Sequence, residues 1–169
     1  MQKRKALAVK RLYLSTILAL TLLLSTTALA ATTMPHFALP SAVDGATIDS
    51  NNYQGRALLV NFFATWCPPC RREIPSFIEV QEKYADQGLT IIGISTDQGG
   101  SKMVANFIKK MKINYPVAME DSQTQKNFQI FSGAVPTSFL INKQGIIVKR
   151  YDGYIDHDTL EHDVSSIIK

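Results

Sequence analysis

Cysteine is scarce in this chain of 169 residues. Its only two cysteines, Cys67 and Cys70, stand three positions apart. This excludes a disulfide that links distant segments, and it excludes a lipid attached through a cysteine near the N-terminus. Internal repeats, low-complexity tracts and internal linkers are also absent. These absences indicate one domain in which both sulfurs serve a single place in the fold.

Acidic residues are absent from the first 30 positions, which carry five basic residues. An apolar run follows over residues 12–29, and Ala28-Leu29-Ala30 has the small-x-small form of a cleavage site. Together these features predict a signal peptide over residues 1–30. The alternative is an uncleaved anchor, because a helix over this run would reach roughly 28 Å, close to the thickness of a bilayer core. Either form predicts export to the periplasm or to the outer face of the cytoplasmic membrane.

The charge of the chain changes once residues 1–30 are set aside. The whole chain has a formal net charge of +4, whereas residues 31–169 contain 13 basic and 14 acidic residues, a net charge of −1. No basic patch with interleaved aromatic residues remains, so a nucleic-acid-binding function loses its main support. The remaining 139 residues suffice for one domain with one core.

Apolar patterning predicts an α/β fold. Residues 57–64 and 89–95 are nearly continuous apolar runs, typical of strands buried on both faces. A helix between them, from Pro68 to about residue 86, predicts a parallel strand–helix–strand unit. The other expected elements are a hairpin of 37–39 and 46–49, helix 101–112, strand 117–119, helix 122–128, a hairpin of 137–141 and 146–151, and helix 157–169.

The two cysteines stand where the first helix begins, and three kinds of site are compatible with their spacing. A structural disulfide across so short a loop contributes only about 2 kcal/mol. A zinc site needs about four ligands, and the remaining candidates are His36, His157 and His162. A redox pair suits the position, because the positive end of a helix stabilises a thiolate at Cys67. The placement therefore favours redox chemistry.

In a redox pair the two sulfurs have different roles. Cys67 is expected to be the more exposed and to attack a disulfide of a partner, whereas Cys70, one turn inside the helix, resolves the mixed disulfide. Pro68 and Pro69 have no N–H group, so two potential donors to the Cys67 sulfur are absent. The thiolate is then less stabilised than in strong oxidants, which favours a reductant.

Glu73 stands three residues after Cys70, on the same face of the helix. One interpretation is a partly buried carboxylate that raises nearby thiol pKa values and carries protons to and from Cys70. The other is a solvated acid that stabilises the first turns of the helix. Spacing alone leaves both interpretations open, and it favours a solvated face for Arg71 and Arg72.

These residues carry a resemblance to a known family. After a buried strand stands the pattern Trp-Cys-x-x-Cys-x-x-Glu-x-Pro, formed by Trp66, Cys67, Cys70, Glu73 and Pro75. With the Val-Pro-Thr that begins at residue 135, this pattern resembles the thioredoxin superfamily. Within the superfamily it is similar to the TlpA/ResA/CcmG group of exported thiol–disulfide oxidoreductases. The match covers most of residues 35–169.

The resemblance implies a thioredoxin fold with an N-terminal β-hairpin and a central helix–strand insert over residues 96–119. Thioredoxin has a buried Asp six residues before its first catalytic Cys. Here that position is Asn61, so the resemblance passes the acid–base role to Glu73. It also implies a cis bond between Val135 and Pro136 that faces the cysteines. The implied substrate-binding residues are Trp66, Pro68, Pro69, Val135 and Pro136.

The resemblance further implies partners of the redox pair. The expected substrates are protein disulfides or dithiols, with no cofactor beyond the redox-active disulfide Cys67–Cys70 and no metal. Electrons would come from a membrane protein of the DsbD/CcdA kind. They would go to cysteines of apocytochrome c or of its maturation factors, and oxidised cysteines of copper sites are equally compatible.

Two functions of other classes remain as alternatives. A copper-carrying assembly protein related to the Sco proteins would use Cys67, Cys70 and His157, because thiolates suit Cu(I). That group, however, spaces its cysteines by three residues rather than two. A peroxidase of the peroxiredoxin kind shares the fold, but the Pro-x-x-x-Thr-x-x-Cys signature is absent, since Ala64 stands three residues before Cys67.

Overall fold

The computed structural model of the protein describes residues 32–131 and 133–168. The predicted signal peptide, residues 1–30, lies outside these ranges. Within them, no helix is both long enough and apolar enough to cross a bilayer.

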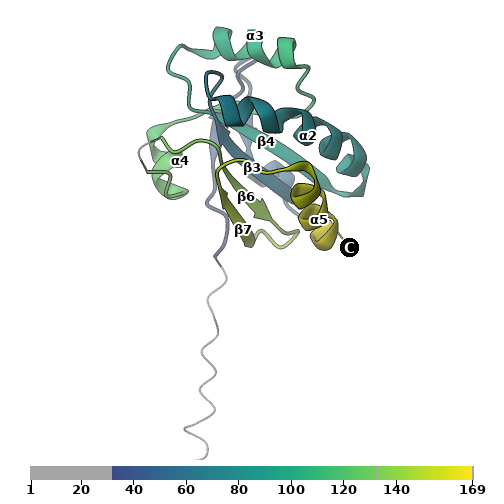
Figure 1. Ribbon diagram of the computed structural model, residues 1–169. Helices are drawn as coiled ribbons and strands as arrows, with labels where there is room; N and C mark the ends of the chain where they lie inside the picture. The colour runs from purple at the N-terminus through teal and green to yellow at the C-terminus, as the bar shows by residue number, and fades with distance from the viewer. Residues whose placement is uncertain (1–31, 132, 169) are drawn as a thin grey trace, which may run out of the picture. The chain divides into compact units, whose positions relative to one another are not determined.

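A central sheet of five strands carries the fold (Figure 1). The strand order is β5-β4-β3-β6-β7, in which β3, β4 and β5 are parallel to one another and β6 and β7 run antiparallel to their neighbours. Every residue of β3 and β4 is buried, as the apolar runs predicted for strands covered on both faces. The strands are β3 (Ala57–Phe63), β4 (Leu89–Ser95), β5 (Val117–Met119), β6 (Thr137–Ile141) and β7 (Ile147–Asp152).

Helices and 3₁₀ turns precede, connect and follow these strands. They are η1 (Ser50–Tyr53), α2 (Pro68–Tyr84), η2 (Ala85–Gln87), α3 (Ser101–Met111), α4 (Ser122–Asn127) and α5 (His157–Ile168). The α-helical part of α2 ends earlier than predicted, because the chain tightens into η2 before it reaches Gly88. Gly88 then adopts a φ of +99°, which favours glycine, and leads into β4.

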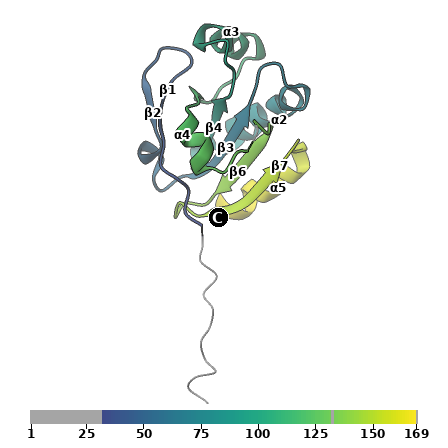
Figure 2. The same cartoon turned by 90° about the vertical axis from the view of Figure 1, so that its left-hand side faces the viewer.

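Two apolar cores lie on the two faces of the sheet. On one face lie α2 and α5 (Figure 1). The core on this face includes Phe77 and Val164. On the other face lie the N-terminal hairpin and α4 (Figure 2). The core on this face includes Phe37 just before the hairpin, Leu39 within it and Phe128 just after α4. The sheet is therefore the middle layer, and the carboxyl end of β3 opens directly into α2.

The predicted fold class is confirmed, with both of its additions. The N-terminal hairpin consists of β1 (Ala38–Pro40) and β2 (Thr47–Asp49), which pair antiparallel. The helix–strand insert consists of α3 and β5, which follow β4 in the chain. β7 begins one residue later than predicted, and Ile146 instead forms an isolated bridge with Thr33.

Candidate active site

The chain turns tightly between β3 and α2, and this turn positions the first cysteine. The N–H of Cys67 donates to the carbonyl oxygen of Ala64 at 3.2 Å, and Cys67 is the N-cap of α2. Pro68 and Pro69 then occupy the first helical positions, where the missing N–H groups leave no helical hydrogen bond unmade. The N–H of Cys70 donates to the Cys67 sulfur at 3.3 Å. The sulfur of Cys67 therefore caps the positive end of the helix.

Cys67 and Cys70 form a disulfide bond at this position. Cys67 retains an exposed fraction of 3%, whereas Cys70 is fully buried. The order of exposure is the one expected from the sequence, although Cys67 is itself nearly covered. An approaching sulfur would thus meet Cys67 first, which is the order that an attacking Cys67 and a resolving Cys70 require.

The loop before β6 lies against the disulfide. Its Val135–Pro136 peptide bond is cis, as the resemblance implied. The carbonyl oxygen of Val135 lies 3.8 Å from the Cys67 sulfur, so this loop faces the cysteines. Val135 is partly buried and Pro136 is buried. The two parts of the predicted substrate-binding set, which are more than 60 positions apart in the chain, are thus adjacent at Cys67.

The rest of the predicted substrate-binding set forms the outer side of the turn. Trp66 has an exposed fraction of 67%. Pro68 is exposed and Pro69 is partly buried. Because Trp66 is directly bonded to Cys67 and largely open to solvent, it cannot be a core aromatic. Its exposed position leaves it free to contact another molecule, and its role in substrate binding stays a prediction.

Glu73 is fully buried on the inner side of α2. One carboxylate oxygen, Oε1, accepts a hydrogen bond from Asn61 Nδ2 at 2.9 Å, and the other, Oε2, accepts one from the N–H of Ile155 at 3.3 Å. Burial raises the pKa of Glu73 to about 8, and the hydrogen bonds from Ile155 and Asn61 oppose this rise. The alternative of a solvated helix-end acid is therefore wrong.

Residues that the sequence did not identify complete the surroundings of Glu73. Asn61 Nδ2 also donates to Ser138 Oγ at 2.9 Å, and the two residues are cross-strand partners of β3 and β6. Tyr115 is buried nearby, and its pKa is raised by burial and further by the charge of Glu73. The only sequence signal for these contacts is the pairing register, which a single sequence does not reveal.

A second buried carboxylate, Asp97, holds the turn from outside the helix. Asp97 accepts hydrogen bonds from the N–H of Thr65 at 2.9 Å and from the Thr65 hydroxyl at 2.7 Å, and a third from the Ser95 hydroxyl at 2.8 Å. This contact was also missed, yet a signal for it exists. In the parallel pair β3–β4, Phe63 faces Ser95, so Thr65 and Asp97 lie two residues beyond a paired position.

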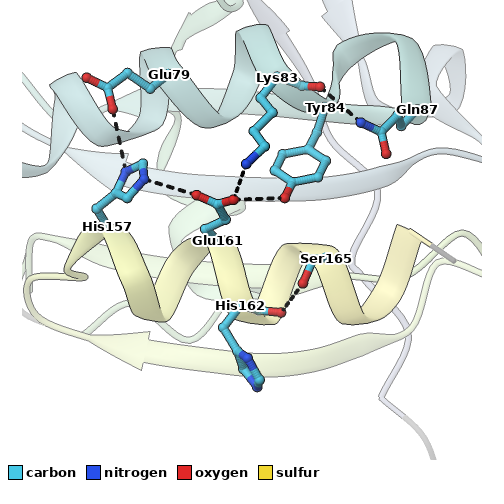
Figure 3. A network of polar contacts seen from close by, with 8 residues as sticks. All are labelled: Glu79, Lys83, Tyr84, Gln87, His157, Glu161, His162 and Ser165. Carbon is cyan, nitrogen blue, oxygen red and sulfur yellow. Dashed lines mark hydrogen bonds and ion pairs between the residues drawn. The ribbon is translucent and has the colours of Figure 1, made fainter.

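The histidines do not join the cysteines. His157 Nε2 lies 3.1 Å from Glu161 Oε2, and His157 Nδ1 lies 3.7 Å from Glu79 Oε2, so its ring is held between α2 and α5 (Figure 3). Within residues 32–131 and 133–168, no group of three or more His, Cys, Asp or Glu side chains is placed to hold a metal ion. The structure therefore does not bring together the ligand set that the copper-carrying alternative requires.

Comparison with known proteins shows that the chain is similar to thiol–disulfide oxidoreductases. The family model described as AhpC/TSA family matches residues 30–150. A protein of Bacillus cereus named thiol-disulfide oxidoreductase ResA is 34% identical over 127 residues, which cover 75% of this chain and 72% of that protein. The ResA protein of Bacillus subtilis is 32% identical over 137 residues, which cover 80% of this chain and 73% of that protein.

A solved structure is similar in both sequence and fold. A thiol:disulfide interchange protein of Chlorobium tepidum, described as a thioredoxin family protein, is 34% identical. The alignment covers 82% of this chain and 97% of that chain, with a TM-score of 0.74. This likeness confirms the predicted thioredoxin fold.

Proposed function

The chain belongs to the AhpC/TSA family and is a thiol–disulfide oxidoreductase similar to the ResA proteins, and on this basis we propose that it reduces disulfide bonds in partner proteins outside the cytoplasm. The observation that carries the proposal is the Cys67–Cys70 disulfide at the start of α2, beside the cis-Pro136 loop. The direction of electron flow is supported by Pro68 and Pro69, which withhold two N–H donors from the Cys67 sulfur.

The proposed reaction passes through a mixed disulfide. The Cys67 thiolate attacks one sulfur of the partner disulfide, so a Cys67–partner bond forms and the partner's second sulfur leaves as a thiolate. Cys70 then loses its proton and attacks the Cys67 sulfur. The bond between Cys67 and the partner breaks, and the partner leaves with two thiols after taking up two protons. Two electrons have moved to the partner, and the Cys67–Cys70 disulfide remains.

Glu73 is proposed to manage the proton of Cys70. A carboxyl group with a pKa of about 8 exchanges its proton readily near neutral pH, so it can take a proton during resolution and return one when the pair is reduced again. An ordinary carboxylate, with a pKa of 4.5, would be a poor proton donor at that pH. The burial that raises the pKa of Glu73 thus suits it to both directions of the cycle.

The partner chain is proposed to dock in extended form along the cis-Pro136 loop. The Val135 carbonyl lies beside Cys67, where it would accept a hydrogen bond from a main-chain N–H of the partner. Trp66, Pro68 and Pro69 would cover the partner segment from the other side of the turn. No cofactor beyond the Cys67–Cys70 disulfide takes part in this proposal.

The identity of the partners is proposed from the resemblance to the TlpA/ResA/CcmG group. The substrate would be the oxidised cysteine pair of apocytochrome c or of one of its maturation factors. Electrons would be supplied by a membrane protein of the DsbD/CcdA kind. Export through residues 1–30, cleaved or retained as an anchor, would place residues 31–169 in the periplasm or at the outer face of the membrane.

Trapping tests the proposal directly. The Cys70→Ala variant, reduced and mixed with oxidised apocytochrome c, should accumulate a mixed disulfide through Cys67, because the resolving sulfur is missing. The product is measured by non-reducing electrophoresis and mass spectrometry. The Cys67→Ser/Cys70→Ala variant is the control and should trap nothing. A Cys70→Ala protein that forms no adduct with any protein disulfide would refute the exchange mechanism.

A further inference from the structure

Three large aromatic side chains are exposed among the described residues, and each lies in a loop that contains or contacts a residue of the candidate active site. Trp66 precedes Cys67, and Phe131, with an exposed fraction of 74%, stands four residues before Val135. Tyr154, with an exposed fraction of 46%, lies between β7 and α5. Aromatic side chains that remain exposed in one area typically mark a surface where another molecule binds.

The loop that carries Tyr154 is tied to the active site by its backbone on both sides. The N–H of Gly153 donates to the carbonyl oxygen of Pro136 at 2.9 Å. The N–H of Ile155 donates to Glu73 Oε2 at 3.3 Å. Tyr154 therefore stands between one residue bonded to the cis-proline and another bonded to the buried carboxylate, so its loop is held beside the active site.

Arg72 lies over the ring of Tyr154. Its guanidinium carbon is 4.9 Å from the ring centroid, within the range of a cation–π contact. Arg72 and its neighbour Arg71 are both exposed, and no carboxylate of the described residues lies within ion-pair distance of either. The ring thus orients the guanidinium of Arg72 while its charge remains uncompensated by the chain.

The position of these arginines is unfavourable for the helix itself. The first turn of α2 contains no acidic residue and is followed directly by Arg71 and Arg72. Positive side chains at this end of a helix are opposed by the helix dipole, which favours acidic residues there. Helix stability therefore gives no reason for two arginines beside the cysteines, whereas a negatively charged partner would.

We propose that Arg72, oriented by Tyr154, is a specificity-determining contact that binds a carboxylate next to the cysteines of the partner. The inference rests on the proposed function and narrows its substrate class to extended segments in which acidic residues flank the disulfide. A guanidinium that lies over a ring keeps its N–H edge available, and this edge matches a carboxylate in a two-point contact. Because the ring already restricts the side chain, less conformational freedom is lost on binding.

Two disulfide-bonded peptides of equal length test this inference, one with aspartate and the other with lysine on both sides of its cysteines. Reduction by the stoichiometrically reduced protein is followed for each peptide, and the ratio of the two second-order rate constants is the result. The wild type should prefer the acidic peptide by about tenfold, the factor that corresponds to one charged hydrogen-bonded contact. The ratio does not depend on the fraction of folded protein, since one preparation supplies both rates.

The variants separate a specific contact from a general effect of charge. Arg72→Gln should bring the ratio close to one, and Arg72→Glu should invert it. Tyr154→Ala should lower the ratio, whereas Tyr154→Phe, which keeps the ring, should preserve it. Arg71→Gln is the matched control, with the same loss of charge one position away, and it should retain most of the preference.

The outcomes also distinguish this inference from the function on which it rests. If the wild type reduces neither peptide, the proposed reductase function is refuted. If it reduces both peptides equally, or if Arg71→Gln and Arg72→Gln lower the ratio to the same extent, the inference is overturned while the reductase function stands.

Discussion

Glu73 and Glu161 are two carboxylates near opposite ends of α2, and their surroundings differ in kind. Glu73, in the second turn of the helix, is fully buried and accepts hydrogen bonds only from Asn61 and the backbone of Ile155. Glu161, on α5, is partly exposed and meets Lys83 and the Tyr84 hydroxyl of α2 (Figure 3). The pKa of Glu73 is raised to about 8, whereas that of Glu161 is lowered.

The difference shows what determines the protonation of a carboxylate packed at either end of α2. At Glu73 the loss of water outweighs two neutral N–H donors, so the protonated form is favoured. At Glu161 the hydrogen bond from Lys83 is the largest effect, and Tyr84 and His157 add to it, so the ionised form is favoured. Burial without a cation thus favours a protonated carboxyl group at Glu73, and a cation with partial exposure favours an ion pair at Glu161.

Replacement of Glu73 tests whether this carboxyl group carries the proton of Cys70. Of the variants proposed here, it should have the largest effect. Glu73→Gln keeps the size of the side chain but removes the titrating group. We expect the resolving step to slow by about 10²- to 10⁴-fold near neutral pH, the usual contribution of a positioned acid or base. Stopped-flow fluorescence of Trp66, the only tryptophan of the chain, measures the step. A change of less than threefold would remove Glu73 from the mechanism.

The same variant makes a prediction for stability. The folded pKa of Glu73, about 8, lies above its ordinary value of 4.5, so between these pH values the folded state binds more protons than the unfolded state. Stability should therefore fall as pH rises through this window, with a slope of up to about 1.4 kcal/mol per pH unit. Glu73→Gln should lack this component. Urea unfolding at pH 5, 6.5 and 8 measures both slopes, and parallel slopes would contradict the raised pKa.

Weakening the hydrogen bonds around Glu73 should sharpen the contrast with Glu161. Asn61→Leu removes the side-chain donor to Glu73, so the pKa of Glu73 should rise further and the pH midpoint of the resolving step should move upward. We expect a loss of about 1–3 kcal/mol in the free energy of unfolding above that midpoint, because an ionised buried oxygen then lacks its partner.

Ser138→Ala is the matched control for Asn61→Leu. It removes Ser138 Oγ, the second acceptor of Asn61 Nδ2, and leaves the hydrogen bond from Asn61 to Glu73 in place. A much smaller shift of the midpoint is expected. Equal shifts in the two variants would mean that the packing of β3 against β6, rather than the hydrogen bond to Glu73, sets the pH dependence.

The sequence predicted the strands and the helix that carry the site, because local patterns determine these elements. The buried runs of β3 and β4, the two prolines that begin α2, and Gly88 after its end each determine their own structure through neighbours in the chain. The cysteines could be assigned for the same reason, since Cys67 occupies the start of the helix whatever packs around it. The cis bond before Pro136 was predicted from the family resemblance rather than from any local pattern.

The surroundings of Glu73 could not be predicted, because they depend on register and packing. Spacing placed Glu73 on the helix face of Cys70, but burial depends on the segment before α5, whose Ile155 lies 82 positions away. The contact of Arg72 with Tyr154 likewise joins residues 82 positions apart. Only the Thr65–Asp97 contact had a usable signal, because the ends of adjacent parallel strands lie side by side.

The smallest effect is expected at the other end of α2, where Lys83→Met removes the cation from Glu161. The pKa of Glu161 should then return toward its ordinary range, while Tyr84 and His157 still hold the carboxylate. Because the folded pKa of Glu161 is lowered, its contribution to stability is present above the ordinary pKa and is lost as pH falls through the folded one. We therefore expect a slight loss of stability at pH 7 that shrinks with added salt and shrinks further as the pH falls below the ordinary pKa of a glutamate, measured by urea unfolding. The rate of the resolving step and its pH midpoint should match the wild type. A shifted midpoint in Lys83→Met would break the comparison, because it would mean that the ion pair and the proton carrier at the two ends of α2 titrate as one coupled group.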